Sequence, residues 1–233
     1  MIDRDIYFDY VRDVLFEGAL TQQQVDGQSV ILAVWEYQAG GTPMTDTRWL
    51  AYMLATTFKE TAFRMWPIEE YGKGSGRDYG VPDPVTGETY YGRGYVQLTW
   101  KDNYAKASAA LGLIDDRDLV EHPWMALDSL IAVRILFRGM AEGWFTGRKL
   151  GQYFNDEDDD PVNARQIING NDCDTEIAAY HQQFLQAIKD ATLSDWPDKA
   201  PAPSKVANLQ LTLSEGVEAM VTVNGVTLVN PVP

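Results

Sequence analysis

Apolar residues recur at intervals of three and four through most of the first 190 residues, which is the spacing of amphipathic helices. In the first such segment Ile6, Tyr10 and Val14 form one apolar row, and Val11 and Leu15 form a second. The pattern predicts helices over residues 5–16, 21–35, 48–65, 103–111, 126–142, 148–154, 162–168 and 175–191. The fold class is therefore predicted to be mainly α.

Polar and helix-breaking residues mark where these helices begin and end. Thr21 and Gln24 have the spacing of a capping box, and either Asp46 or Thr47 is placed to begin the third helix. Pro67 must end that helix, because the residue before a proline avoids the helical conformation. Residues 72–87 contain five glycines and two prolines and are predicted to form a loop.

The hydrophobic period changes to two near the C-terminus. Alternating leucines and two valine-rich runs around Asn224-Gly225 predict a β-hairpin, with Val221 and Val223 facing Leu228 and Val226. The predicted organisation is a helical domain over residues 1–194, a Pro-rich linker over 195–205 and a small β tail over 206–233. So small a sheet cannot fold alone. It is expected to dock on the domain or to join two copies in a homo-oligomer.

Composition and charge narrow the possible partners. An apolar fraction of 45% in 233 residues fits a globular core. The net charge of −15 argues against nucleic acid, whose phosphates attract basic surfaces. No apolar run reaches the roughly 18 residues of a membrane span, so no membrane insertion is expected. The single cysteine, Cys173, excludes an internal disulfide, and no signal peptide is recognised.

Residues 90–100, Tyr-Tyr-Gly-Arg-Gly-Tyr-Val-Gln-Leu-Thr-Trp, are the most informative run in the chain. Glycines allow backbone to approach a ligand closely, whereas Tyr91, Arg93, Gln97 and Trp100 offer flat faces and hydrogen-bonding groups. Such a surface suits the wall of a sugar-binding cleft. With acidic residues upstream, it indicates a glycoside hydrolase.

Hydrolysis of a glycosidic bond usually needs one protonated and one ionised carboxyl group. Glu60 lies near the end of the third predicted helix, where the helix dipole disfavours negative charge, and this suits a general acid. The alternative is a surface ion pair with Arg64. Glu69 and Glu70 follow after Pro67, which lets the chain fold back toward Glu60. Either could be the second carboxyl or an ordinary loop carboxylate.

Three residues of the 90–100 run have alternative interpretations. Thr99 is placed to cap the next helix, or its hydroxyl could hold the attacking water. Gln97 alternates with Val96 and Leu98, so it should point away from the core and line the cleft. Arg93 either orients a catalytic carboxylate or is a surface loop arginine.

No metal site or cofactor is predicted. The acidic run at residues 156–160 lacks the glycine and glutamate of an EF-hand loop and is interpreted as a solvated acidic loop. His122 and His181 are far apart and have no cysteine or histidine neighbours. Cys173 has no histidine nearby to activate it as a nucleophile.

At these residues the sequence resembles the family 19 glycoside hydrolases, the chitinase-like group, and most of all its bacteriophage and prophage endolysin branch. The resemblance covers nearly all of residues 6–190 and does not include the tail after Ser194. It is carried by the runs at residues 20–27, 51–61, 67–72, 90–104 and 163–170. The resemblance implies a two-lobed, lysozyme-like helical body with a cleft between the lobes.

The resemblance also implies roles for individual residues. The general acid falls on Glu60, the general base on Glu70, and the hydroxyl that holds the water on Thr99. Substrate-binding positions fall on Gln97, Asn103 and Asn169, beside the cleft-wall candidates Glu69, Tyr91, Arg93 and Trp100. Two positions differ: Lys59 replaces the motif histidine and could pair with a carboxylate, and Asn171-Asp172-Cys173 stands where chitinases usually carry Gly-x-Glu-Cys.

The resulting hypothesis is an endolysin-type glycoside hydrolase that cleaves the β-1,4 bonds of bacterial peptidoglycan, as a muramidase does. It would be made in the host cytoplasm and would act on the cell wall, in the periplasm, after release. The alternatives are a chitinase acting on polymers of N-acetylglucosamine and a non-catalytic, wall-binding virion protein.

Overall fold

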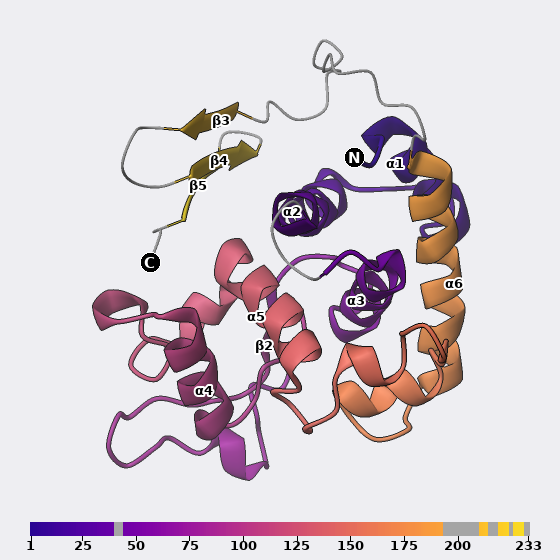
Figure 1. Cartoon of the computed structure of the whole chain (residues 1–233). Helices are drawn as coiled ribbons and strands as arrows, with labels where there is room; N and C mark the ends of the chain where they lie inside the picture. The colour runs from indigo at the N-terminus through magenta and orange to yellow at the C-terminus, as the bar shows by residue number, and fades with distance from the viewer. Residues whose placement is uncertain (40–43, 193–209, 214–218, 224–225, 231–233) are drawn as a thin grey trace.

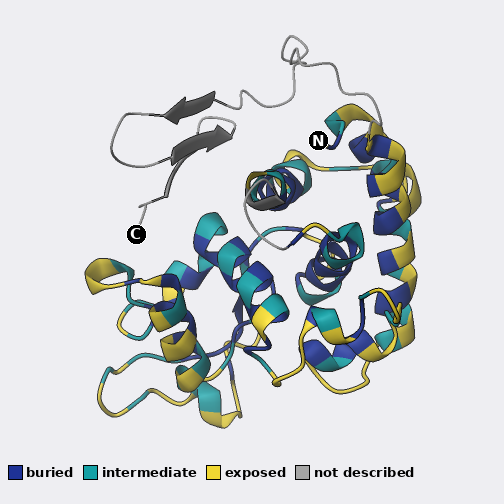
Figure 2. Ribbon diagram, viewed as in Figure 1, coloured by how far each residue is buried: buried dark blue, intermediate teal, exposed yellow. Residues whose placement is uncertain are grey.

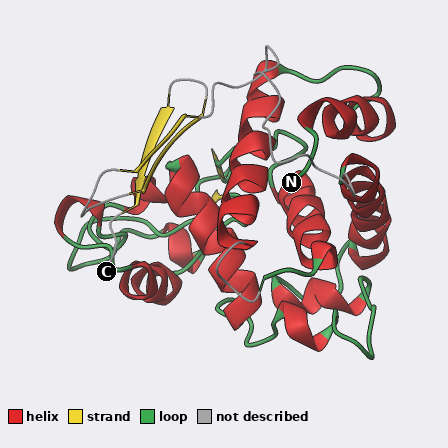
Figure 3. Ribbon diagram, turned by 45° about the horizontal axis from the view of Figure 1, so that its top comes forward, coloured by secondary structure: helices red, strands yellow, loops and turns green. Residues whose placement is uncertain are grey.

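The computed structural model describes residues 1–39, 44–192, 210–213, 219–223 and 226–230. Helices make up most of this part of the chain, and the strands are short (Figure 3). This confirms the predicted fold class. The α-helices are α1 (Arg4–Leu15), α2 (Gln22–Ala39), α3 (Thr47–Glu60), α4 (Lys101–Leu111), α5 (Ser129–Glu142) and α6 (Asp174–Ala191). The strands are β1 (Ile68–Glu69), β2 (Arg93–Gly94), β3 (Gln210–Leu213), β4 (Ala219–Val223) and β5 (Val226–Asn230).

The helices form two groups that meet at α5. On one side α6 packs against both α1 and α3, and on the other α4 packs against α5 (Figure 1). Helix α5 also contacts α2 and α3, so it joins the groups. Along its length α6 is buried toward α3 and exposed on its outer side (Figure 2).

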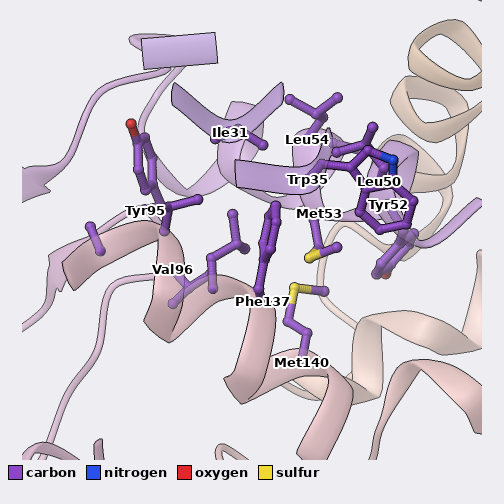
Figure 4. Packing of buried hydrophobic residues seen from close by; sticks show 14 of the residues in the cluster. Ile31, Trp35, Leu50, Tyr52, Met53, Leu54, Tyr95, Val96, Phe137 and Met140 are labelled. Atoms are coloured by element: carbon purple, nitrogen blue, oxygen red, sulfur yellow. The ribbon is translucent and has the colours of Figure 1, made fainter. Parts of the chain in front are cut away.

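The core is continuous across the junction between these groups. Trp35 of α2, Met53 of α3 and Phe137 and Met140 of α5 point toward one another (Figure 4). The Trp35 and Phe137 rings meet edge to face with centroids 6.3 Å apart. Burial of such aromatic surface is the main stabilising contribution here.

Both predicted helix caps are confirmed. The Thr21 hydroxyl accepts from the backbone N–H of Gln24 at 3.3 Å. The side-chain oxygen of Gln24 accepts from the backbone N–H of Thr21 at 2.8 Å, which completes a reciprocal capping box. The Asp46 carboxylate accepts from the Arg48 N–H at 2.9 Å. Each cap satisfies N–H groups that the first helical turn leaves without an intrahelical partner.

The predicted apolar face of α1 is only partly correct. The Val11 row packs on the core, but Ile6 and Val14 are exposed. The buried face is centred on Tyr7, Phe8 and Val11. The two aromatic side chains bury more surface than the aliphatic row would, and this sets how the helix is turned against α6.

Several predicted helices are shorter or tighter than expected. The segments at residues 148–154 and 162–168 form only 3₁₀ turns, η4 (Leu150–Gln152) and η5 (Asn163–Ile167). The segment at residues 126–142 is divided between η3 (Pro123–Leu127) and α5. Gly151 interrupts the first of the two 3₁₀ segments and Pro161 precedes the second, and runs this short do not sustain α-helical hydrogen bonding on their own. The remaining 3₁₀ turns are η1 (Asp78–Gly80) and η2 (Asp115–Arg117).

The tail forms a sheet with the predicted register. Val221 pairs with Leu228 and Val223 pairs with Val226, as expected. Strand β3 adds to β4, so the tail is a three-stranded antiparallel sheet rather than a lone hairpin. The connecting Asn224-Gly225 and the linker lie outside the described residues. Self-association through the tail stays a prediction.

His181 predicts how stability should depend on pH. The side chain is fully buried between the rings of Tyr52 and Phe154, and neither ring nitrogen has a hydrogen-bond partner in the described part of the chain. Burial lowers the pKa of His181 to about 4. Between pH 6.5, near the pKa of the unfolded histidine, and pH 4, the histidine is protonated in the unfolded chain and neutral in the folded protein. The free energy of unfolding therefore falls as the pH drops toward 4.

His181→Leu should remove this dependence. Between pH 7 and pH 4.5 the free energy of unfolding of the wild type should fall by about 2 kcal/mol more than that of the variant, since one pKa unit corresponds to about 1.4 kcal/mol. Urea denaturation at both pH values measures this. At pH 7 to 8 the difference between the two proteins should not change with pH, which is the internal control. Parallel curves down to pH 4.5 would show that the histidine is not responsible.

Candidate active site

Glu60 is the last residue of α3, as its predicted place near the helix end requires. It does not pair with Arg64, whose guanidinium lies over the Tyr71 ring instead. The Glu60 Oε1 atom accepts from Nη1 of Arg165 at 2.7 Å. The surface ion-pair interpretation is therefore wrong, because α3 ends at Glu60 and the position four residues on lies outside the helix.

Arg165 joins Glu60 to a second carboxylate. It lies on η5 with its side chain only 5% exposed, whereas the Glu60 side chain is 17% exposed. Its Nε donates to the backbone oxygen of Asp172 at 3.0 Å, and its Nη2 reaches the Asp172 carboxylate at 3.3 Å. Burial alone would lower the pKa of the Arg165 guanidinium. The negative charges of Glu60 and then of Asp172 have the larger combined effect, so the pKa of Arg165 is raised. The arginine is thus a fixed cation shared by two acids.

Lys59, which replaces the motif histidine, pairs with a carboxylate of a different helix. Its Nζ lies 2.6 Å from Oε2 of Glu176 on α6. Hydrogen bonds from Lys59 and then Tyr180 lower the pKa of Glu176. Lys59 thus pairs with Glu176 and not with Glu60, and the carboxyl whose pKa it lowers is that of Glu176.

Glu69 lies on β1 and is held by cations. Strand β1 pairs with β2, placing Glu69 opposite Arg93. The Glu69 carboxylate accepts from the Tyr91 hydroxyl at 2.6 Å and lies 2.8 Å from Lys73 Nζ and 3.6 Å from Arg93 Nε. The hydrogen bonds from Lys73 and Tyr91 lower the pKa of this carboxyl. Glu69 is thus an anchored, ionised group.

Glu70 has a different set of partners. Its carboxylate accepts from the Tyr79 hydroxyl and from the Gly92 N–H, each at 3.1 Å. Both donors are neutral, and among the described residues no salt bridge reaches it. Burial and the bond to Glu70 raise the pKa of Tyr79, so its hydroxyl remains a donor. Glu70 is thus held by neutral groups, whereas cations hold Glu69.

Gly92 brings Glu70 close to Gln97. A Cβ atom at Gly92 would lie 2.9 Å from Gln97 Oε1 and 3.4 Å from Glu70 Cβ. Gln97 itself has a φ of +53° and is half-buried, whereas Val96 and Leu98 are buried. Its side-chain nitrogen donates to the backbone oxygens of Ile68 and Gly94, each at 3.2 Å. Val96 and Leu98 are thus buried and Gln97 is more exposed than either, as the alternation of these residues predicts. A tight turn, not a strand, produces this arrangement.

Thr99 is not a helix cap. The cap position of α4 is Trp100, and the Thr99 hydroxyl donates to the Gln97 backbone oxygen at 2.7 Å. The N-cap interpretation was therefore wrong, since the turn at Gln97 takes the hydroxyl proton. Asn103 donates to the Thr99 backbone oxygen at 2.8 Å, which secures the turn. The Thr99 oxygen keeps lone pairs that could accept from a water.

Arg93 is buried and is no surface loop residue. Its side chain is 5% exposed. It stacks on Tyr91 with 3.7 Å from Cζ to the ring centroid, donates to the Thr89 backbone oxygen at 2.9 Å and reaches the Tyr104 hydroxyl at 3.1 Å. Its Nε lies 3.6 Å from the Glu69 carboxylate, and the predicted role of orienting a catalytic carboxylate stays a prediction.

The candidate residues therefore fall into two clusters. The acid cluster contains Glu60, Arg165 and Asp172, and Asn169 follows on the same turn, its N–H donating to the Arg165 backbone oxygen at 3.1 Å. The hairpin cluster contains Glu69, Glu70, Tyr91, Arg93, Gln97, Thr99, Trp100 and Asn103.

Sequence reasoning missed the functional contacts of Arg165, Asp172 and Tyr79. Arg165 stands in the 163–170 run that carries the family resemblance, and Asp172 stands close to the glutamate position of the chitinases, so both had a signal. Tyr79 carried only the weaker signal of an aromatic residue in a glycine-rich loop.

Residues 156–159 are exposed, which fits the predicted acidic loop. Within the described residues no group of three or more histidine, cysteine, aspartate or glutamate side chains is placed to hold a metal ion. In the same residues, none of the helices combines the length and apolar character that crossing a membrane requires.

Comparison with known proteins identifies the fold. No protein-family model and no curated protein matches the chain. Among solved structures, it is similar to chitinase C from Streptomyces griseus HUT6037, with a TM-score of 0.53 and 19% identity over 81% of this chain and 76% of that one. A bacterial family 19 chitinase gives a TM-score of 0.49 and 22% identity, covering 80% of this chain and 94% of the other. A mutant of chitinase C gives 0.48 and 20%, covering 81% and 92%. The chain thus shares the chitinase fold.

Proposed function

We propose that the protein is an endolysin-type glycoside hydrolase that cleaves β-1,4 bonds of bacterial peptidoglycan. One observation carries the proposal: Glu60 and Glu70 belong to separate clusters and have chemically different partners. An acid and a base with different environments are what hydrolysis of a glycosidic bond needs. Glu60 donates its proton to the leaving oxygen, and a water attacks from the opposite face.

Arg165 is shared between Glu60 and Asp172. When Glu60 is protonated, the Arg165 guanidinium keeps an ionised partner in Asp172, at 3.3 Å. No buried cation is left unpaired, which would otherwise be costly. After proton transfer, the Glu60 carboxylate is again stabilised by Arg165.

Glu70 and Thr99 hold the attacking water from two sides. The only hydroxyl proton of Thr99 is donated to the backbone, so Thr99 can only accept a hydrogen bond from the water. Glu70 accepts the other water proton and then removes it as the general base. A water that donates both protons in this way directs a lone pair at the anomeric carbon.

Comparing the rates of hydrolysis of peptidoglycan and of chitin oligomers identifies the substrate. We expect purified sacculi to be hydrolysed faster than oligomers of N-acetylglucosamine. Mass spectrometry of the released muropeptides should show N-acetylmuramic acid at the new reducing end. Cleavage of the oligomers alone would instead support a chitinase, which the structural similarity to chitinase C favours. No hydrolysis of either substrate would support a wall-binding protein.

Trp100 is expected to stack on a sugar ring. Its indole is 51% exposed and meets the edge of Tyr79, whose hydroxyl holds Glu70. Its φ of +75° is a backbone conformation that favours glycine, so a tryptophan at this position implies a use for the side chain. Trp100→Ala should raise KM roughly tenfold with little change in kcat, the usual scale for a truncated aromatic contact.

Trp124 is the matched control for this variant. It is 49% exposed and packs on His122, so it resembles Trp100 in accessibility but does not contact Tyr79. Trp124→Ala should leave KM within about twofold of the wild type. If the two variants raise KM equally, the Trp100 assignment is wrong.

A further inference from the structure

The two clusters are joined by a short segment with an unusual backbone. Residues 61–66, here called the crossover segment, lead from Glu60 toward β1. Three of them, none a glycine, have positive φ: Ala62 at +48°, Phe63 at +67° and Met65 at +52°. Such conformations cost energy for residues with a Cβ, and they persist only where surrounding contacts hold them.

The N-terminal half of α2 supplies those contacts. The Gln24 side-chain nitrogen donates to the Phe63 backbone oxygen at 3.0 Å. A Cβ atom at Gly27 would lie 1.7 Å from the Met65 backbone oxygen, so only glycine allows the crossover segment to pass this close. The Gly27 oxygen in turn accepts from the Tyr95 hydroxyl at 3.2 Å, which ties α2 to the 90–100 run.

The segment is also closed from within. The Thr61 hydroxyl is fully buried, donates to the Thr57 backbone oxygen at 2.7 Å and accepts from the Met65 N–H at 3.0 Å. Met65 is itself fully buried. The crossover segment is therefore held at its start by α3 and at its middle and end by α2.

We propose that Gln24 and Gly27 are positioning residues that set the placement of Glu60 relative to Glu70. This inference rests on the proposed hydrolase function. Neither residue reaches the reacting atoms; they act through the backbone of Phe63 and Met65. Displacement of reacting groups by about 1 Å can reduce the rate strongly, so an anchor on this segment acts on kcat rather than on binding.

The capping box offers a way to separate this role from helix stability. The Gln24 oxygen completes the cap of α2 by accepting from the Thr21 N–H at 2.8 Å, whereas its nitrogen holds Phe63. Gln24→Glu keeps an oxygen that can accept from the Thr21 N–H but loses the nitrogen that donates to Phe63. The added negative charge lies near the positive N-terminal end of the helix dipole, which stabilises it. Thr21→Ala does the reverse, because it weakens the cap and keeps the Gln24 nitrogen.

The test measures kcat, KM and backbone amide exchange for the full-length wild type, Gln24→Glu and Thr21→Ala on solubilised peptidoglycan. Gln24→Glu should lower kcat roughly tenfold, leave KM within about twofold and speed exchange at residues 62–66. Thr21→Ala should lower the melting temperature while keeping kcat within about twofold. Gly27→Ala, where it folds, should lower kcat further than Gln24→Glu.

Three results would overturn the inference, and they differ from one another. Wild-type kcat and wild-type exchange in Gln24→Glu, with an active wild type, would remove the positioning role alone. A wild type without hydrolysis of peptidoglycan or of N-acetylglucosamine oligomers would remove the proposed function and this role with it. Equal losses of kcat in Gln24→Glu and Thr21→Ala would assign the effect to the helix cap and also overturn the inference.

Discussion

Glu60→Gln should reduce kcat by at least about a thousandfold while the protein stays folded. The amide cannot donate the proton that the leaving oxygen needs, and loss of general acid catalysis typically costs 10²–10⁴ in rate. Its oxygen can still accept from Arg165, whose position 2.7 Å away suits a side chain of the same shape. Arg165 also keeps Asp172 as an ionised partner, so the structure should tolerate the change.

The measurement is release of reducing ends from sacculi, together with a thermal unfolding curve. The matched control is Glu36→Gln, because Glu36 forms a comparable pair with Arg4 at 2.7 Å and neither residue belongs to the two clusters. Its loss should affect stability and leave turnover near that of the wild type. Normal lysis by Glu60→Gln would refute the assignment of the acid.

Glu70→Gln should reduce kcat by about a hundredfold or more, and Glu69→Gln by less than about tenfold. A glutamine at position 70 can accept from the Gly92 N–H with its single oxygen and donate to the Tyr79 hydroxyl with its nitrogen, but it cannot take a proton from water. Glu69 is instead held by Lys73 and Tyr91, which lower its pKa and make it a weaker base.

The two variants can be separated by their effect on stability as well. The contacts of Glu69 contribute stability above the pKa of the unfolded carboxyl, and this contribution is lost as the pH falls through the lower folded value. Glu69→Gln should therefore flatten the stability profile in that acid range, whereas its kcat stays close to that of the wild type. If Glu69→Gln is the inactive variant and Glu70→Gln the active one, the base is Glu69.

The helices could be predicted from the sequence because their signals are local. Periodic apolar residues identified α1, α2, α3, α4 and α6, and the Thr21 and Asp46 caps depend on atoms within three residues. The valine pairing of the tail likewise follows from the alternation of apolar residues on either side of Asn224-Gly225 in the sequence. The 3₁₀ turns were missed because an α-helical pattern in a short run does not show which hydrogen bonds the chain can sustain.

The candidate carboxyl groups could be chosen from the sequence, but not their partners. Residue type and position identified Glu60 near a helix end and left both Glu69 and Glu70, after a proline, as candidates for the second carboxyl, and the family resemblance put the base on Glu70. Only the tertiary structure decided that Arg165, more than a hundred residues away, holds Glu60 and that neutral donors hold Glu70 while cations hold Glu69. The energy of such ion pairs depends on the distance between the charges in space, and the separation of two residues along the chain does not give that distance.

The sequence by itself thus determined the helical class, the helix starts and the chemical character of the site, since each depends on neighbouring residues. The tertiary structure decided which acids share a cation, which face of α1 is buried and how the crossover segment is held. Those outcomes depend on packing between distant elements, as at Gly27, where only the fold shows that the Met65 backbone leaves no room for a side chain.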